Sequence, residues 1–249
     1  MFGVKIMSEL YYERIPMPKN SKILRRMMNH AAYRFESMDD LWHAAAVAMS
    51  ASFWNGVPVF QHQFDLKRYY DLLVSQRFDA ILETGVYAGG SAMFFMDILD
   101  ILGMHDVPYI GIDLDARMIF EHAFSHSHTH LWIQRDVLAH ETVEAVRPYV
   151  EGKKCLVILD SVHTKEHVDE ELKMYAPLVT VKDSYLVVSD SDHNGRPILA
   201  DYGPSAGESV EEFMTENGLG RKLEFEIDKK IELKYGPFTV SPNGWLRKL

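Results

Sequence analysis

The segment AILETGVYAGG (residues 80–90) decides how this chain is expected to fold. Its first residues, Ala80-Ile81-Leu82, form a short apolar run typical of a buried strand, and the run ends at Glu83-Thr84-Gly85. A glycine-rich turn follows, and residues 91–102 then continue as an apolar helix. A buried strand, a glycine turn and a helix in direct succession form the unit from which parallel α/β sheets are built.

The same order of elements recurs further along the chain. Short apolar runs stop at or near an aspartate, and helical stretches such as residues 164–175 separate them. The runs are residues 109–112 before Asp113, 131–133 before Asp136, 156–159 before Asp160, and 185–188 before Asp190. Apolar strands alternating with helices predict a doubly wound, mostly parallel α/β sheet covered on both faces. A helix at residues 208–217 and late strands at 222–227 and 238–249 complete a predicted sheet of seven strands.

The chain before this sheet has a different character. Residues 21–52 and 64–75 show helical periodicity, and Asn55-Gly56 breaks the pattern between them. We therefore expect a helical segment over residues 1–70 and a ligand-binding domain over residues 71–249.

Composition excludes several classes of protein. The 249 residues include 26 Lys+Arg and 36 Asp+Glu, a net charge of -10, which argues against binding to a nucleic-acid backbone. No run of about 18 apolar residues is present, so we expect no membrane span. The single cysteine, Cys155, excludes a disulfide scaffold. These features favour a soluble cytoplasmic protein with a small-molecule partner.

The acidic strand ends indicate the kind of ligand. Carboxyl ends of parallel strands meet at one edge of a doubly wound sheet, where ligands bind. Glu83 directly before the glycine turn would repel a pyrophosphate, and the turn is not a G-x-G-x-x-G motif. Asp113 can accept hydrogen bonds from ribose hydroxyls, and Asp136 can meet an adenine amino group. A ligand with ribose, adenine, an ammonium group and a positive centre describes S-adenosylmethionine better than NAD.

Several longer stretches together resemble the cephalosporin hydroxylase and rhamnosyl O-methyltransferase family, which has the class I, Rossmann-like methyltransferase fold. They are FWNGVPVFQHQFD (53–65), ILETGVYAGGSAMFF (81–95), YIGIDLD (109–115), LVILDSVH (156–163), YLVVSD (185–190), NGRPILADYGP (194–204) and NGWLRKL (243–249). The resemblance implies S-adenosylmethionine binding, Mg2+ in the methyltransferase members, and multimeric enzymes with an N-terminal helical segment, so we expect a homo-oligomer. The residues expected at the cofactor are Gln61, Glu83, Gly85, Tyr87, Gly89, Ser91, Asp113 and Asp136.

Asp160 and Asp190 are the expected metal ligands. They end strands that the methyltransferase sheet order makes neighbours, and oxygen ligands of this kind favour Mg2+. Similar family members carry Glu-Asp where this chain has Ser189-Asp190, so Ser189, Asp192 or a water is the candidate third ligand. The family resemblance also implies that His163, in the D-S-V-H motif with Asp160, is the general base.

The expected function is Mg2+-dependent O-methylation of a hydroxyl on a sugar moiety or another natural-product scaffold. Two alternatives stay open: a cephalosporin-hydroxylase-like role, and a non-catalytic cofactor-binding subunit of a biosynthetic complex. No iron triad of two histidines and one carboxylate is evident in the sequence, which disfavours an independent oxygenase. The alternating histidines of HSHTH (126–130) are expected to lie in a solvated loop.

Overall fold

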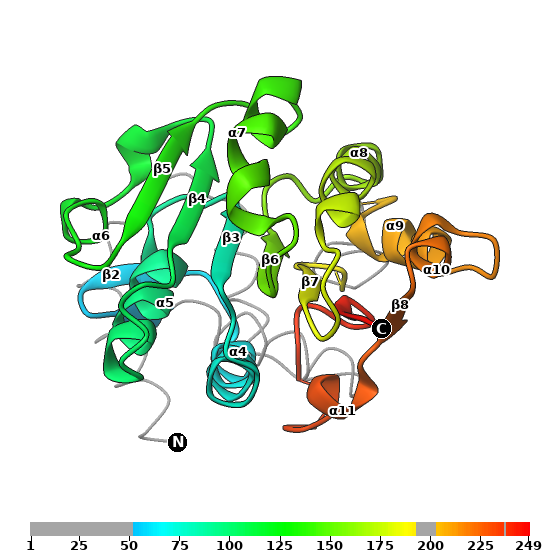
Figure 1. The fold of residues 1–249 in the computed structure, drawn as a ribbon, viewed down its shortest axis with the longest axis horizontal. Coiled ribbons are helices and arrows are strands. Elements are labelled where there is room, and N and C mark those ends of the chain that lie inside the picture. The colour runs from blue at the N-terminus through cyan, green and yellow to red at the C-terminus, as the bar shows by residue number, and fades with distance from the viewer. Residues whose placement is uncertain (1–51, 193–202, 237) are drawn as a thin grey trace, which may run out of the picture.

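The computed structural model describes residues 52–192, 203–236 and 238–249, and its centre is a seven-stranded sheet (Figure 1). The strand order is β5-β4-β3-β6-β7-β9-β8. The parallel strands are the apolar runs identified in the sequence: β3 (Ala80–Thr84), β4 (Tyr109–Asp113), β5 (His130–Gln134), β6 (Cys155–Leu159) and β7 (Tyr185–Val188). β9 (Trp245–Lys248) runs antiparallel to both β7 and β8 (Phe225–Ile227). The predicted doubly wound, mostly parallel seven-stranded sheet is confirmed.

Helices cover both faces of this sheet (Figure 1). The covering helices are α4 (Gln63–Gln76), α5 (Gly90–Ile101), α7 (His140–Val150), α8 (Lys165–Tyr175) and α9 (Ala206–Phe213). Leu82 and Val157 point into a core with α7, α8 and α9, whereas Ile81 and Ile158 point into a core with α4 and α5. Successive strand residues face opposite sides, so a strand buried on both faces must be apolar throughout.

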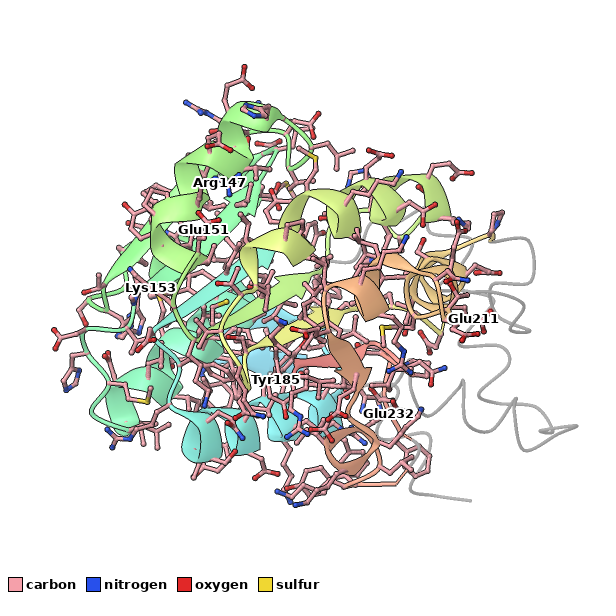
Figure 2. The ribbon with its side chains drawn as sticks, turned by 45° about the vertical axis from the view of Figure 1, so that its right-hand side comes forward. Arg147, Glu151, Lys153, Tyr185, Glu211 and Glu232 are labelled. Carbon is pink, nitrogen blue, oxygen red and sulfur yellow. The ribbon has the colours of Figure 1, made fainter. Side chains whose placement is uncertain are left out.

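The outward faces of the helices carry charge. On α7, Arg147 contacts Glu144 at 2.7 Å and Glu151 at 3.2 Å. Figure 2 shows Arg147 of this helix and Glu151, which directly follows it, near each other at the surface of the molecule. Exposed pairs of this kind contribute little to stability, so the sheet cores carry most of it.

A hairpin precedes the sheet. β1 (Ser52–Trp54) pairs with β2 (Val57–Val59) across Asn55-Gly56, both of which have positive φ. The indole Nε1 of Trp54 donates a hydrogen bond of 2.8 Å to Asp97 on α5. The hairpin is thereby fixed against α5, one of the helices that cover the sheet. The residues that follow the hairpin therefore lie near the carboxyl end of β3.

Three predicted boundaries were wrong. The strand expected at 222–227 begins only at Phe225, because the short helix α10 (Leu219–Lys222) comes first. The strand expected at 238–249 is confined to β9, because Pro242 has no N–H for a sheet ladder and the N–H of Gly244 turns back to Ser241. The helix expected at 208–217 is α9, which starts earlier because Ser205 and Glu208 form a capping box. The other short helices are η1 (Ala116–Met118), α6 (Glu121–Phe124), η2 (Ala176–Leu178) and α11 (Lys229–Glu232).

The histidine-rich segment is packed rather than solvated, contrary to the prediction. His128 is buried, and its Nδ1 lies 2.6 Å from Oδ1 of Asp100 on α5. His126 Nε2 lies 3.0 Å from Oδ1 of Asp97 on the same helix. The carboxylates of α5 give these imidazoles partners, which a reading of the segment alone could not reveal.

The predicted division of the chain at residue 70 stays a prediction. Helix α4 runs across that position, and the helical region expected over residues 21–52 lies almost entirely outside the described residues. Within the described part of the chain, no helix is both long and apolar enough to cross a membrane.

Candidate functional site

The site lies at the carboxyl ends of β3 and β6. These strands are neighbours, but the chain proceeds from β3 toward β4 and from β6 toward β7, on opposite sides. The loops that follow such a pair of strands diverge, and the crevice between them is the usual ligand site of a doubly wound sheet.

The two loops approach each other so closely that glycine is required. Gly85 has a φ of +77°, and a Cβ at this position would lie 2.1 Å from the carbonyl oxygen of Asp160. At Gly90 a Cβ would lie 2.0 Å from the carbonyl oxygen of Pro58 in the hairpin. Any side chain at either glycine would collide with backbone, so these glycines allow the turn to sit between the β6 loop and the hairpin.

A small cleft with a volume of about 40 Å³ opens at this turn. Its lining combines residues of the hairpin exit, the glycine turn and the β6 loop: Pro58, Phe60, Gln61, Gly85, Val86, Tyr87, Ala88, Gly90, Ser91 and Asp160. The structure thus brings together Gln61, Gly85, Tyr87 and Ser91 of the expected cofactor set. Glu83, Gly89, Asp113 and Asp136 stand outside this lining in the described part of the chain.

Buried oxygen atoms without partners surround the turn. Glu83 is fully buried; its Oε2 accepts a hydrogen bond from the hydroxyl of Tyr109, and its Oε1 has no partner among the described residues. Burial is the main cause that raises the pKa of Glu83 to about 7. The Oε1 of Gln61 is also buried with no partner in the described structure. Unsatisfied buried acceptors are costly, and they fit a ligand that brings N–H donors or positive charge.

Asp113 organises the glycine turn from the end of β4. Its Oδ2 accepts the backbone N–H of Tyr87 at 2.8 Å, and its Oδ1 accepts the N–H of Asp115 at 2.9 Å. Tyr87 has a φ of 49°, which is unusual for a residue with a side chain. The carboxylate therefore helps to hold Tyr87 in this conformation. Asp136, beyond β5, accepts the N–H of Leu138 at 2.9 Å.

Asp160, His163 and Asp190 form one group of possible metal ligands, with ligand atoms all within 4.8 Å of one another. Oδ2 of Asp160 accepts a hydrogen bond of 2.6 Å from Nε2 of Gln61. Nε2 of His163 lies 3.0 Å from Oδ2 of Asp190. Burial, followed by the nearby charges of Asp190 and Glu83, raises the pKa of Asp160 well above its usual range. Carboxyl groups that repel each other in this way fit a bound cation, which would stabilise the charged forms.

The group differs from the expected ligand set at its third member. Asp192 is buried but is not part of the group, whereas His163, expected only as a base, is. Ser189 is buried, and its hydroxyl acts on Asp160 by lowering that carboxyl's pKa, against the larger effect of burial. Asp160 and Asp190 are the two carboxylates of this group.

The contact between Gln61 and Asp160 has no signal in the sequence. Gln61 and Asp160 are 99 positions apart, and only the docking of the hairpin exit on the β6 loop joins them. Asp65, in the same N-terminal stretch, is instead structural: it contacts Arg68 at 2.9 Å and accepts the N–H of Val240 at 2.9 Å. The stretch of residues 53–65 thus contributes Pro58, Phe60 and Gln61 to the cleft, whereas Asp65 lies in the core.

Comparisons with known proteins identify relatives of the whole described domain. Residues 47–249 match the family model described as Rhamnosyl O-methyltransferase/CmcI. The rhamnosyl O-methyltransferase of Mycobacterium tuberculosis (strain H37Rv) is 28% identical over 211 residues, covering 82% of this chain and 81% of that protein. The Mycobacterium leprae protein of the same name is 28% identical over 207 residues, covering 82% and 86%.

Solved structures of CmcI share the fold. An apo structure has a TM-score of 0.61 at 20% identity, covering 94% of this chain and 87% of that one. A structure titled as the Mg-SAM form has a TM-score of 0.59 at 19% identity, covering 94% and 88%. At this level of identity the likeness concerns the fold.

Proposed function

We propose, since the chain belongs to the rhamnosyl O-methyltransferase/CmcI family, that it is an S-adenosylmethionine-dependent O-methyltransferase that uses Mg2+. The acceptor class we propose is a hydroxyl of a sugar moiety or another natural-product scaffold. The observation that carries the proposal is the contact between the glycine turn and the Asp160 loop, where Gly85 leaves no room for a Cβ beside Asp160. This contact would bring a cofactor bound at the turn close to a cation held by Asp160 and Asp190.

The charge of the cleft supports a sulfonium cofactor. Glu83 Oε1 and Gln61 Oε1 are buried acceptors without partners among the described residues, so the turn favours a ligand with an ammonium group. A pyrophosphate would meet repulsion from Glu83, as expected from the sequence. The relative titled as a Mg-SAM structure agrees with this choice of cofactor. We assign the ribose hydroxyls to Asp113 and the adenine edge to Asp136, as the sequence predicts.

Asp160 and Asp190 would hold Mg2+, with waters at its remaining positions. Both ligands are oxygen donors that lie in one group, which suits this ion. When bound, the ion would supply an electrostatic field that lowers the pKa of a nearby acceptor hydroxyl. Gln61 fixes the Asp160 carboxylate through its 2.6 Å hydrogen bond, so part of the ligand set is already oriented.

His163 would remove the acceptor's proton. Its ring is held by Asp190 at 3.0 Å and is partly exposed. As the acceptor oxygen forms a bond to the methyl carbon, the bond from that carbon to sulfur breaks and its electron pair stays on sulfur. Positive charge on the sulfonium is lost in this step, so the chain contributes chiefly by orienting the two reactants.

A hydroxylase-like role has less support. The metal-ligand group contains one histidine and two carboxylates, and no group of two histidines with one carboxylate occurs among the residues the structure describes. The homo-oligomeric state and the cytoplasmic location stay predictions.

Transfer of an isotopically labelled methyl group tests the proposal. The full-length protein is incubated with methyl-labelled S-adenosylmethionine, Mg2+ and a panel of hydroxylated glycosides, and products are searched by mass spectrometry for one added labelled methyl. The same protein carrying Asp160→Asn is the control, and at the same Mg2+ concentration it should give much less product. Tight cofactor binding without transfer to any glycoside, under conditions where a related family enzyme is active, would instead favour a non-catalytic subunit.

A further inference from the structure

Glu171 is a carboxylate that the proposed mechanism does not use. It lies on α8 with 1% of its surface exposed, on the face where Val168, Leu172 and Tyr175 pack against the sheet. Its Oε1 accepts hydrogen bonds from the hydroxyl of Thr84 at 2.7 Å and from the hydroxyl of Ser161 at 2.9 Å. Burying a carboxyl group in a core is costly, and an apolar residue would pack at this position without that cost.

The two donors belong to the two loops that build the site. Thr84 is the last residue of β3 and directly precedes Gly85 of the cofactor turn. Ser161 directly follows Asp160, the proposed metal ligand. One carboxylate oxygen of Glu171 is therefore the common acceptor for both loops.

The loops are also joined to each other. The backbone N–H of Asp160 lies 3.1 Å from the carbonyl oxygen of Thr84 and 3.2 Å from its Oγ1. Thr84 Oγ1 thus accepts from Asp160 while its hydroxyl donates to Glu171. A chain of hydrogen bonds runs from the carboxylate of Glu171 through Thr84 to the peptide that carries Asp160.

We propose that Glu171 is a positioning residue that couples cofactor binding to cation binding. The inference rests on the proposed function, since it concerns the same two subsites. A ligand that orders the glycine turn fixes Thr84, and through Glu171 it fixes Ser161 and the Asp160 peptide, so the cation finds its ligand already ordered. Linkage requires the reverse as well: a bound cation raises cofactor affinity by the same factor.

A purely structural role makes a different prediction. If Glu171 only accepts hydrogen bonds from two buried hydroxyls, removing its carboxylate changes the stability of the protein. The affinities for metal and for cofactor then either fall independently of each other or do not change. The ratio between metal affinity with cofactor and metal affinity without it would then be unaltered. This ratio is the readout that separates coupling from structural support.

The experiment measures that ratio on the full-length protein. Mg2+ binding is followed by calorimetry, and Mn2+ binding by the electron paramagnetic resonance signal of the free ion, each with and without saturating S-adenosylhomocysteine. We expect S-adenosylhomocysteine to tighten metal binding in the wild type by about tenfold, within the range usual for coupled sites. Metal should tighten S-adenosylhomocysteine binding by the same factor.

Three variants and a control identify the residue responsible. Glu171→Met has a similar length and no acceptor, so the coupling factor should fall to within about twofold of unity. Glu171→Gln keeps a carbonyl oxygen for both hydroxyls and should retain most of the coupling. Thr84→Val removes the hydroxyl that donates to Glu171, so its coupling factor should resemble that of Glu171→Met. Thr84→Val also tests the inference if Glu171→Met does not fold. The matched control is Glu170→Met, because Glu170 is about half exposed and pairs with Lys173 at 2.6 Å on the outer face of α8.

Full coupling in Glu171→Met or in Thr84→Val would overturn the inference. So would a wild type that binds metal and S-adenosylhomocysteine independently. A wild type that binds neither ligand would contradict the proposed function itself, and the two failures are thereby distinguished.

Discussion

Nε2 of His163 lies 3.0 Å from Oδ2 of Asp190, and this contact joins the loop after β6 to the residues that follow β7. β6 and β7 are adjacent parallel strands, so their carboxyl ends bring the two side chains to one edge. The side chains are 22% and 23% exposed, which leaves the imidazole accessible to an acceptor while the carboxylate orients it. A histidine oriented by a carboxylate is suited to proton transfer near neutral pH.

Replacing His163 tests that role. His163→Ala should lower kcat by about 10²–10⁴-fold, the usual contribution of a general base. Cofactor affinity should change little, because His163 does not line the cleft at the glycine turn. The measurement is kcat for both proteins, with S-adenosylmethionine binding followed separately.

The result also separates a base from a metal ligand, since His163 belongs to the Asp160–Asp190 group. If His163→Ala raises the Mg2+ concentration needed for half-maximal activity and saturating Mg2+ then restores kcat, the imidazole acts as a metal ligand and not as the base. A variant with near-wild-type turnover at all Mg2+ concentrations would leave deprotonation to the metal and solvent.

Metal removal should abolish turnover. Dialysis against EDTA removes the cation that Asp160 and Asp190 would share, and added Mg2+ should restore activity. Asp160→Asn should raise the Mg2+ concentration for half-maximal activity by at least about tenfold, as the loss of one ligand implies. Asp192→Asn should leave it unchanged, because Asp192 lies outside the ligand group. Full activity of the dialysed enzyme in metal-free buffer would exclude a role for the cation.

Asp113 should matter for cofactor affinity. Asp113→Ala removes an acceptor for ribose hydroxyls and also the acceptor of the Tyr87 N–H. We expect S-adenosylmethionine binding to weaken by about 1.5–3 kcal/mol, the range for hydrogen bonds to a charged group. Asp115→Ala is the control, because the Asp115 side chain is 36% exposed and its carboxylate pairs with Arg117 at 2.7 Å. Calorimetry on both variants measures the effect, and equal affinities for Asp113→Ala and wild type would remove Asp113 from the cofactor site.

Glu83 should make the ligand-free protein less stable as pH rises. Burial raises its pKa to about 7, so the folded state holds a proton that the unfolded state loses near pH 4.5. The folded state binds more protons between these values, and the free energy of unfolding therefore falls with increasing pH across that window. The expected loss is on the order of 3 to 4 kcal/mol by pH 8, at 1.36 kcal/mol per pKa unit.

The variant Glu83→Gln isolates this effect, because an amide does not titrate. Urea unfolding at pH 5, 6, 7 and 8 should show Glu83→Gln gaining stability relative to the wild type as pH rises. Glu121→Gln, at an exposed position, should run parallel to the wild type. A constant difference between Glu83→Gln and wild type at all four pH values would contradict a raised pKa. Other buried groups also titrate in this range: Glu171 has its pKa raised to about 7, and Asp65 has its pKa raised to about 6, both chiefly by burial. The comparison between variants cancels their contributions.

The sheet and its functional edge could be predicted because their causes are local. Ile81, Leu82 and their counterparts in the other strands are apolar in short runs, since a parallel strand is buried on both faces. Each run stops at or near an acidic residue. Neighbouring parallel strands have their carboxyl ends at the same edge of the sheet, so the sequence indicates that these residues lie along one edge. The packing of His128 against Asp100 could not be predicted in this way, because nothing near residue 128 indicates a carboxylate on a distant helix.

The sequence by itself therefore determined the apolar runs that form the strands and the glycine turn at Gly85. It also determined the acidic residues Glu83, Asp160 and Asp190 at or near the ends of those runs. Gln61 and His163 were expected at the site, but only the tertiary structure decided their partners: Gln61 contacts Asp160, and His163 contacts Asp190. It also placed Glu171 in contact with both loops. The physical reason is the range of the interactions. Periodicity and turn formation depend on residues a few positions apart, whereas a hydrogen bond of 2.6 Å between residues 99 positions apart exists only after the layers have packed.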